Sequence, residues 1–172
     1  MPATKISIHN AKPEKLFYVV ANVIVYRKAD NRCLVLQRDP REKVHPGKYA
    51  FIGGKLEWKD LDIAHPGRIN GEVLDYPNAV EELLAREARE EAGITIGAAL
   101  MYINSVAYVR PDETPTCSIK FVAECISGEV TLEEGAFINY AWVNEEEVKE
   151  LSCVDGIEDE VAQAIRLMCA AL

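Results

Sequence analysis

The hydrophobic positions of the chain fall into runs typical of strands and of helices. Six runs rich in β-branched and aromatic residues predict strands. They are residues 16–26, 32–38, 49–57, 100–109, 116–126 and 139–143. The polar stretch "RKADN" separates the first two runs, so we expect them to form a hairpin. The third run, "YAFIGGKLE", leads into the glycine pair Gly53–Gly54.

A helical period appears in "PNAVEELLAREAREEAG" and predicts a helix over residues 79–92. Asn78 lies where an N-cap belongs, and Glu81 follows three residues later, close to the pattern of a capping box. Gly93 lies where a helix commonly ends in a left-handed glycine. We therefore expect the helix to begin after Asn78 and to stop before Gly93.

Near the C-terminus, "NEEEVKEL" predicts a short capped helix, and apolar residues at helical spacing predict an amphipathic helix over residues 157–172. Asp155 and Glu158 resemble another capping box at its start. Strands and helices mix without regular β-α-β alternation, which favours an α+β fold with a mixed sheet between helices. The length of 172 residues suggests a single domain over residues 1–172.

Residues 58–77 show no clean period and are punctuated by prolines and glycines, so we interpret them as a long loop or insertion. Loops of this length in a compact domain are usually functional or disordered. The segment carries apolar residues that need burial. We expect it to fold over a functional site as a substrate-selecting flap or to pack on a second subunit of a homodimer.

Charge and cysteine usage restrict the function classes. The net charge of −9 argues against a general binder of nucleic acid or of anionic membranes, which needs a basic surface. The five cysteines form no C-x-x-C pair, which argues against a zinc site or a disulfide framework. No apolar run reaches the ~18 residues of a membrane span. These features are typical of a cytoplasmic protein with reduced thiols.

The helix predicted over residues 79–92 carries an unusual concentration of carboxylates. Continuing its apolar stripe by steps of three, four and seven residues leads to Glu87 and Glu91, and Glu90 falls beside them. Carboxylates on a face that points into the protein need cations, and oxygen ligands favour Mg²⁺ or Mn²⁺. The alternative is a solvated helix stabilised by salt bridges, because Glu82, Arg86 and Glu90 form an i,i+4 ladder.

The stretch "REAREEAGI" from Arg86 to Ile94, downstream of "GGKLE", resembles the signature of Nudix hydrolases. The pattern G-x5-E-x7-R-E-U-x-E-E-x-G-U, with U an apolar residue, is matched at every fixed position of its second half. The first glycine of the pattern resembles Gly54. Asn78 stands where the pattern has Glu, and an insertion inside the motif fills most of residues 58–77. The resemblance covers about residues 16–170.

The resemblance implies a Nudix-type α/β/α sandwich and the roles of several residues. Glu87, Glu90 and Glu91 would hold the metal, with help from the carbonyl of Gly54, and Arg86 would orient Glu87. The implied reaction is hydrolysis of a diphosphate linkage in a small nucleotide substrate, a nucleoside diphosphate linked to another group. A Nudix-like nucleotide-binding or regulatory domain without catalysis, and an interaction module whose insertion binds a protein, are the alternatives.

Side chains outside the helix are weaker candidates. Arg38 and Lys55 could contact phosphate, although a surface charge is an equal alternative for each. Glu133 or Glu134 is the candidate for a further metal ligand, with a solvated turn as the alternative. Tyr49, Phe51 and Trp58 could stack on a base, with core packing favoured for Phe51.

Overall fold

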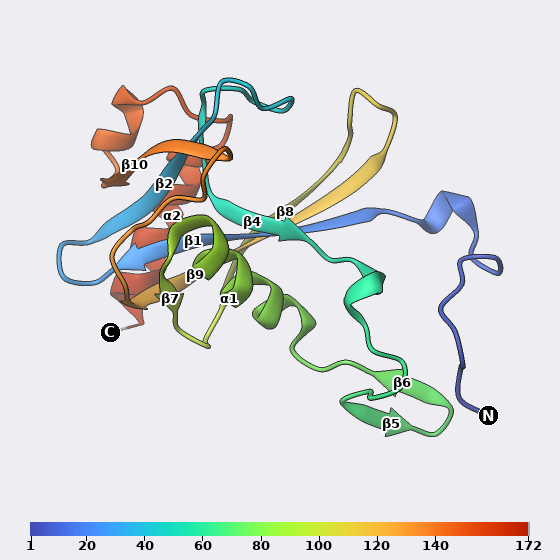
Figure 1. Cartoon of the computed structure of the whole chain (residues 1–172). Coiled ribbons are helices and arrows are strands. Elements are labelled where there is room, and N and C mark those ends of the chain that lie inside the picture. Colours follow the sequence, from blue (N-terminus) through green and yellow to red (C-terminus); the bar gives the residue numbers. More distant parts are fainter. Residues whose placement is uncertain (172) are drawn as a thin grey trace.

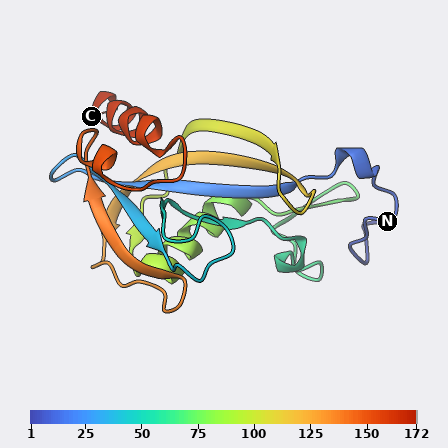
Figure 2. The ribbon, with the colours of Figure 1, turned by 90° about the horizontal axis from the view of Figure 1, so that it is seen from above.

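The computed structural model describes residues 1–171 and shows a mixed eight-stranded sheet with one α-helix on each face (Figures 1 and 2). The strands are β1 (Tyr18–Arg27), β2 (Arg32–Arg38), β3 (Tyr49–Ala50), β4 (Ile52–Lys55), β7 (Thr95–Ile96), β8 (Met101–Val109), β9 (Pro115–Ser127) and β10 (Phe137–Val143). The α-helices are α1 (Ala79–Ala92) and α2 (Ile157–Ala170), and three short 3₁₀ helices are η1 (Pro13–Lys15), η2 (Trp58–Asp60) and η3 (Glu147–Glu150).

Strand β1 lies at the centre of the sheet and positions the glycine pair. One edge of β1 pairs in parallel with β9. The other edge is shared, because the end of β1 pairs with β2 and its beginning pairs with β4, both antiparallel. In this register Asn22 lies opposite Gly53 and Ala21 lies opposite Gly54. The glycine pair is therefore held inside the sheet and not in a flexible loop.

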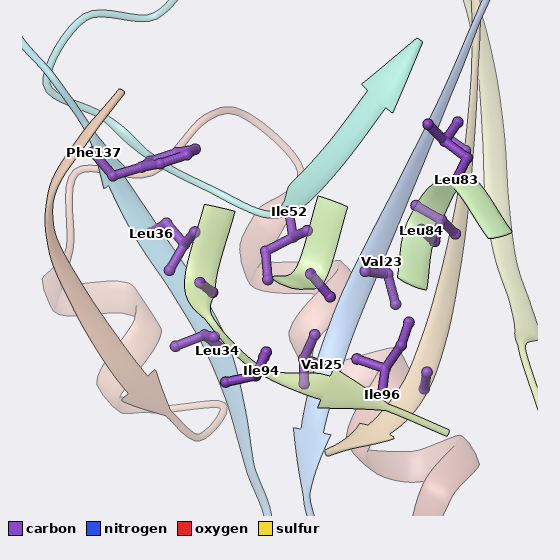
Figure 3. Packing of buried hydrophobic residues seen from close by; sticks show 14 residues of the cluster. Val23, Val25, Leu34, Leu36, Ile52, Leu83, Leu84, Ile94, Ile96 and Phe137 are labelled. Carbon is purple, nitrogen blue, oxygen red and sulfur yellow. The ribbon is translucent and has the colours of Figure 1, made fainter. Parts of the chain in front are cut away.

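Two hydrophobic clusters cover the two faces of the sheet. On one face, α1 packs through Leu83, Leu84 and other buried residues against β1, β2 and β4 (Figure 3). On the opposite face, α2 packs through Ile157, Val161 and Ala164 against Ile24 and neighbouring residues. The arrangement confirms the predicted α+β fold, an α/β/α sandwich with a mixed sheet.

The insertion at residues 58–77 is more ordered than a plain loop. It contains η2 and a two-stranded hairpin of β5 (Arg68–Asn70) and β6 (Val73–Asp75), which turns at Gly71 with φ of 64°. The hairpin lies beyond the N-terminal end of α1, so it does not fold over the middle of that helix (Figure 1). Ile69 and Val73 are 58% and 59% exposed, so the expected burial of these apolar groups does not occur within the chain.

The ends of the helices confirm one prediction and correct two. Gly93 ends α1 in the left-handed conformation, as expected, with its N–H bonded to the carbonyl of Arg89 at 3.0 Å. Asn78 lies at the N-cap position, but its backbone is left-handed (φ 59°) and its side chain makes no capping bond. Gly156, with φ of 93°, takes the place before α2, so Asp155 caps nothing. In both cases a left-handed turn at the helix start replaces the extended backbone that side-chain capping needs.

Within residues 1–171, no helix is long and apolar enough to cross a membrane. The last residue of the helix predicted over 157–172 lies outside the described residues.

Candidate active site

The glycine pair of β4 and the carboxylates of α1 meet at the face of the sheet that α1 covers. A Cβ atom added to Gly54 would lie 2.5 Å from Oε1 of Glu87, so only glycine admits this carboxylate here. The backbone N–H of Gly53 donates to Oε2 of Glu91 at 3.1 Å. Glu87 and Glu91 are one turn apart on α1, and both therefore lie against β4.

The surroundings of Glu91 disfavour a negative charge. Burial raises the pKa of the Glu91 carboxyl to about 8, and the neighbouring Glu87 and Glu133 add to the rise. The hydrogen bond from Gly53 and the charge of Arg38 act in the opposite direction but do not cancel it. A carboxyl placed in this way binds a proton or a cation at neutral pH.

Arg86 connects the carboxylates to one another and to the insertion. Its Nη2 donates to Oε1 of Glu87 at 3.2 Å, and its Nε lies 3.8 Å from Oε2 of Glu90. Its Nη1 lies 3.6 Å from Oδ2 of Asp60 in η2. The sequence analysis did not single out Asp60, although it follows Gly54 by six residues, the spacing between the first glycine and the first glutamate of the pattern G-x5-E. The contact with Glu87 is consistent with an orienting role for Arg86.

The expectation that all three helix carboxylates point into the protein is wrong for Glu90. Its side chain is 59% exposed, whereas that of Glu87 is 16% exposed. At about 100° per residue, Glu90 is turned roughly 60° from Glu87, away from β4. Part of the predicted salt-bridge ladder is thus present on the solvent side of the same helix, between Arg86 and Glu90.

The donors fit a hard divalent cation only in part. No group of three or more His, Cys, Asp or Glu side chains in residues 1–171 is arranged to hold a metal ion. Glu87 and Glu91 nevertheless offer oxygen atoms beside a bare glycine backbone, and oxygen is the donor that Mg²⁺ prefers. The raised pKa of Glu91 shows that this position favours a neutralising partner. Glu90 would have to turn toward Glu87 to complete the set.

The remaining candidates lie at different distances from this centre. Arg38 is near enough to lower the pKa of Glu91, but its guanidinium bonds to the carbonyl of Val44 and to Glu42 in the following loop. Lys55 is exposed at the end of β4. The N–H of Glu133 bonds to the carbonyl of Glu91 at 3.1 Å, which brings Glu133 beside the site.

The aromatic candidates separate by burial. Phe51 is 7% exposed and belongs to the core on the α2 face, in line with the favoured interpretation. Tyr49 is 8% exposed in the same core and accepts a hydrogen bond from Asn139. Trp58 is 57% exposed and lies in η2 of the insertion, so it is the aromatic side chain of this set that a ligand can reach.

Comparison with known proteins identifies the family to which this fold belongs. The family model of the NUDIX domain matches residues 17–164. The chain therefore belongs to the NUDIX domain family, and this membership supports a hydrolase that acts on pyrophosphate bonds. A comparison with curated proteins found no match.

Solved structures share the fold at low sequence identity. A MutT protein from Methanosarcina mazei is 21% identical, with a TM-score of 0.61 over 91% of this chain and 99% of that protein. The NUDIX domain of Shewanella oneidensis NrtR, in complex with ADP ribose, is 13% identical, with a TM-score of 0.63 over 92% and 94%. A C. elegans Ap4A hydrolase is 18% identical, with a TM-score of 0.59 over 90% and 99%.

Proposed function

We propose that the protein catalyses Mg²⁺-dependent hydrolysis of a diphosphate linkage in a nucleoside diphosphate derivative. The observation that supports this most strongly is the placement of Glu87 and Glu91 against the side-chain-free backbone of Gly53 and Gly54. Two carboxylates in a partly buried position, one of them with a raised pKa, form a site that gains from a divalent cation. ADP ribose and Ap4A in the names of similar structures favour a nucleotide substrate.

Each proposed role rests on a group of this chain. Glu87, Glu90, Glu91 and the carbonyl of Gly54 would hold Mg²⁺ or Mn²⁺. When bound, such an ion neutralises phosphate charge and makes a bound water more acidic. Glu87 and Glu90 are the proposed carboxylates that accept the proton of the attacking water, and Arg86 orients Glu87 through its contact at 3.2 Å.

Phosphate binding is assigned to the two basic residues near the ends of β2 and β4. Arg38 already contacts the loop after β2, so it would have to exchange its bond with Glu42 for one with phosphate. Lys55 is exposed and needs no such exchange. Glu133 is the better placed of the two acidic loop candidates for a further ligand, because its backbone bonds to Glu91.

The test is an assay of a panel of nucleoside diphosphate derivatives with Mg²⁺ in excess. We expect release of a monophosphate product, its loss in EDTA, and a fall in turnover of about 100-fold or more in Glu87→Gln. Glu82→Gln is the matched control, since Glu82 is exposed on the same helix outside the proposed set. Binding of nucleotides without any hydrolysis would overturn the proposal in favour of a non-catalytic domain.

A further inference from the structure

The insertion builds a cleft of its own beyond the N-terminal end of α1. The cleft has a volume of about 530 Å³, within the range of ligand sites in proteins. Its walls come from the chain after β4, from η2, from the hairpin with the residues that follow it, and from the first residue of α1. Residues 58–77 therefore form, with their neighbours in the chain, a cleft that a ligand can enter.

The walls of the cleft are mostly apolar and aromatic. Trp58, Leu61, Leu74 and Tyr76 contribute to them, and Trp58 leaves more than half of its surface in contact with solvent. The hydroxyl of Tyr76 is buried without a hydrogen-bond partner. An exposed indole is unfavourable in a free protein, and a flat ligand stacked on it would relieve that exposure. The Tyr76 hydroxyl has almost no accessible surface, so a ligand reaches it only if the side chain moves.

The charges of the cleft argue against a phosphate as its occupant. Arg68, the basic residue of the lining, is paired with Asp75 at 2.7 Å. Glu57, the other acidic residue of the lining, contacts Lys59. Because both pairs are already neutralised, a phosphate would find no unpaired positive charge in the lining. An uncharged planar ring needs no such charge.

The cleft and the carboxylates lie along the same helix. Ala79, in the lining, precedes Glu87 by eight residues, which corresponds to about 12 Å of helix. Asp60 in η2 reaches Arg86 at 3.6 Å and so connects the insertion to the side chain that contacts Glu87. A nucleotide with its phosphates at the carboxylates can extend its base toward the cleft.

We propose that this cleft binds the nucleobase of the substrate, with the base stacked on the indole of Trp58. The proposal rests on the proposed function for the identity of the ligand as a nucleotide. It makes the insertion a specificity element that recognises the base at a distance from the reacting phosphates. The base would then be held in the cleft while the α1 carboxylates and their metal ion bind the diphosphate.

The test uses nucleosides, which carry a base but no phosphate, so that it is independent of hydrolysis. Saturation-transfer NMR of the full chain in EDTA would be recorded with adenosine, guanosine, cytidine and uridine, and with ribose as the base-free control. We expect transfer to the base protons of at least one nucleoside and none to ribose. In Trp58→Ala the affinity should fall about five- to tenfold or more, and Trp58→Phe should keep most of it.

Ile69→Ala is the matched control, because Ile69 is 58% exposed in the same insertion but does not line the cleft. It should bind nucleosides like the parent. The proposal is overturned if the parent transfers no saturation to any base, or if Trp58→Ala gives the transfer of the parent.

A kinetic measurement separates this proposal from the proposed function. With the best substrate of the panel, Trp58→Ala should raise KM about five- to tenfold or more and leave kcat nearly unchanged. Hydrolysis with an unchanged KM in Trp58→Ala would overturn the base site and leave the proposed reaction standing. Nucleoside binding that depends on Trp58, in a protein that hydrolyses nothing, would support the base site and overturn the reaction.

Discussion

The position of Glu91 makes the metal-free protein less stable as the pH rises. Its carboxyl has a pKa of about 8 in the folded protein and the ordinary value of 4.5 in the unfolded chain. Between these values the folded state binds more protons than the unfolded state does. The free energy of unfolding therefore falls with pH, by at most about 1.4 kcal/mol per pH unit from this one group.

Replacing Glu91 by Gln removes that dependence and keeps an oxygen that can accept the Gly53 N–H. Between pH 4.5 and about 8 the free energy of unfolding of the parent should fall relative to that of Glu91→Gln. Because Glu91 is only partly buried, we expect this change to stay below what the maximal slope would give, at about 2 to 4 kcal/mol. The stability added by Glu91→Gln, relative to the parent, should be close to zero at the acid end of the window. It should then increase steadily until the pH passes the folded pKa of about 8.

Urea unfolding in EDTA, at a series of pH values, measures this difference directly. Taking the difference between two proteins cancels most of the other titrating groups. Glu82→Gln, at an exposed position of the same helix, should show no such increase. A difference between Glu91→Gln and the parent that stays constant with pH would refute the reasoning. Added Mg²⁺ should then stabilise the parent more than the variant at alkaline pH, because the ion binds the folded carboxylate.

Three further predictions concern single features of the fold. Gly54→Ala should cut turnover about tenfold or more with little loss of melting temperature, because the new methyl meets the Glu87 side chain from Cγ outward, which can move aside. Gly53→Ala, whose methyl would lie 2.5 Å from the Ala21 carbonyl, should instead lose about 1 to 3 kcal/mol of stability. If Gly54→Ala and Gly53→Ala lowered the melting temperature and the turnover to the same extent, this distinction between the two glycines would be contradicted. Asn78→Ser should cost about 1 kcal/mol by urea unfolding, since serine caps helices well but is poor in the left-handed region; no cost would restore the capping interpretation. A Gly-Ser linker in place of most of residues 58–77 should keep the fold and change substrate preference, oligomeric state or both; the parent's solution mass by light scattering, together with the parent's ranking of substrates, would remove the proposed role of the insertion.

The sequence predicts the main elements well where hydrophobic periodicity is strong. The helix over residues 79–92 is confirmed as α1, because its buried face and its terminal Gly93 are both local signals. The two-residue strand β7 has no period to detect. The sequence analysis does not predict the hairpin of residues 68–75, although Asn70-Gly71 is a turn signal, because its strands are short and mostly exposed.

The sequence predicts only part of the candidate site. The spacing of Glu87 and Glu91 places them on one side of a helix in any structure. Which side of α1 meets the glycine pair depends on how β4 pairs with β1, and this is a tertiary contact that no local pattern contains. For the same reason the helical spacing alone does not show that Glu90 lies on the exposed side or that Asp60 reaches Arg86.

Metal binding by the α1 carboxylates is the central claim, and a direct measurement tests it without any substrate. Electron paramagnetic resonance of free Mn²⁺, titrated with the parent and with Glu87→Gln, Glu91→Gln and Glu82→Gln, gives the affinity of each protein. We predict saturable binding by the parent and by Glu82→Gln, and a weakening of about tenfold to 100-fold in each of the other two variants. Equal binding by all four proteins, or no binding by the parent, would contradict the account.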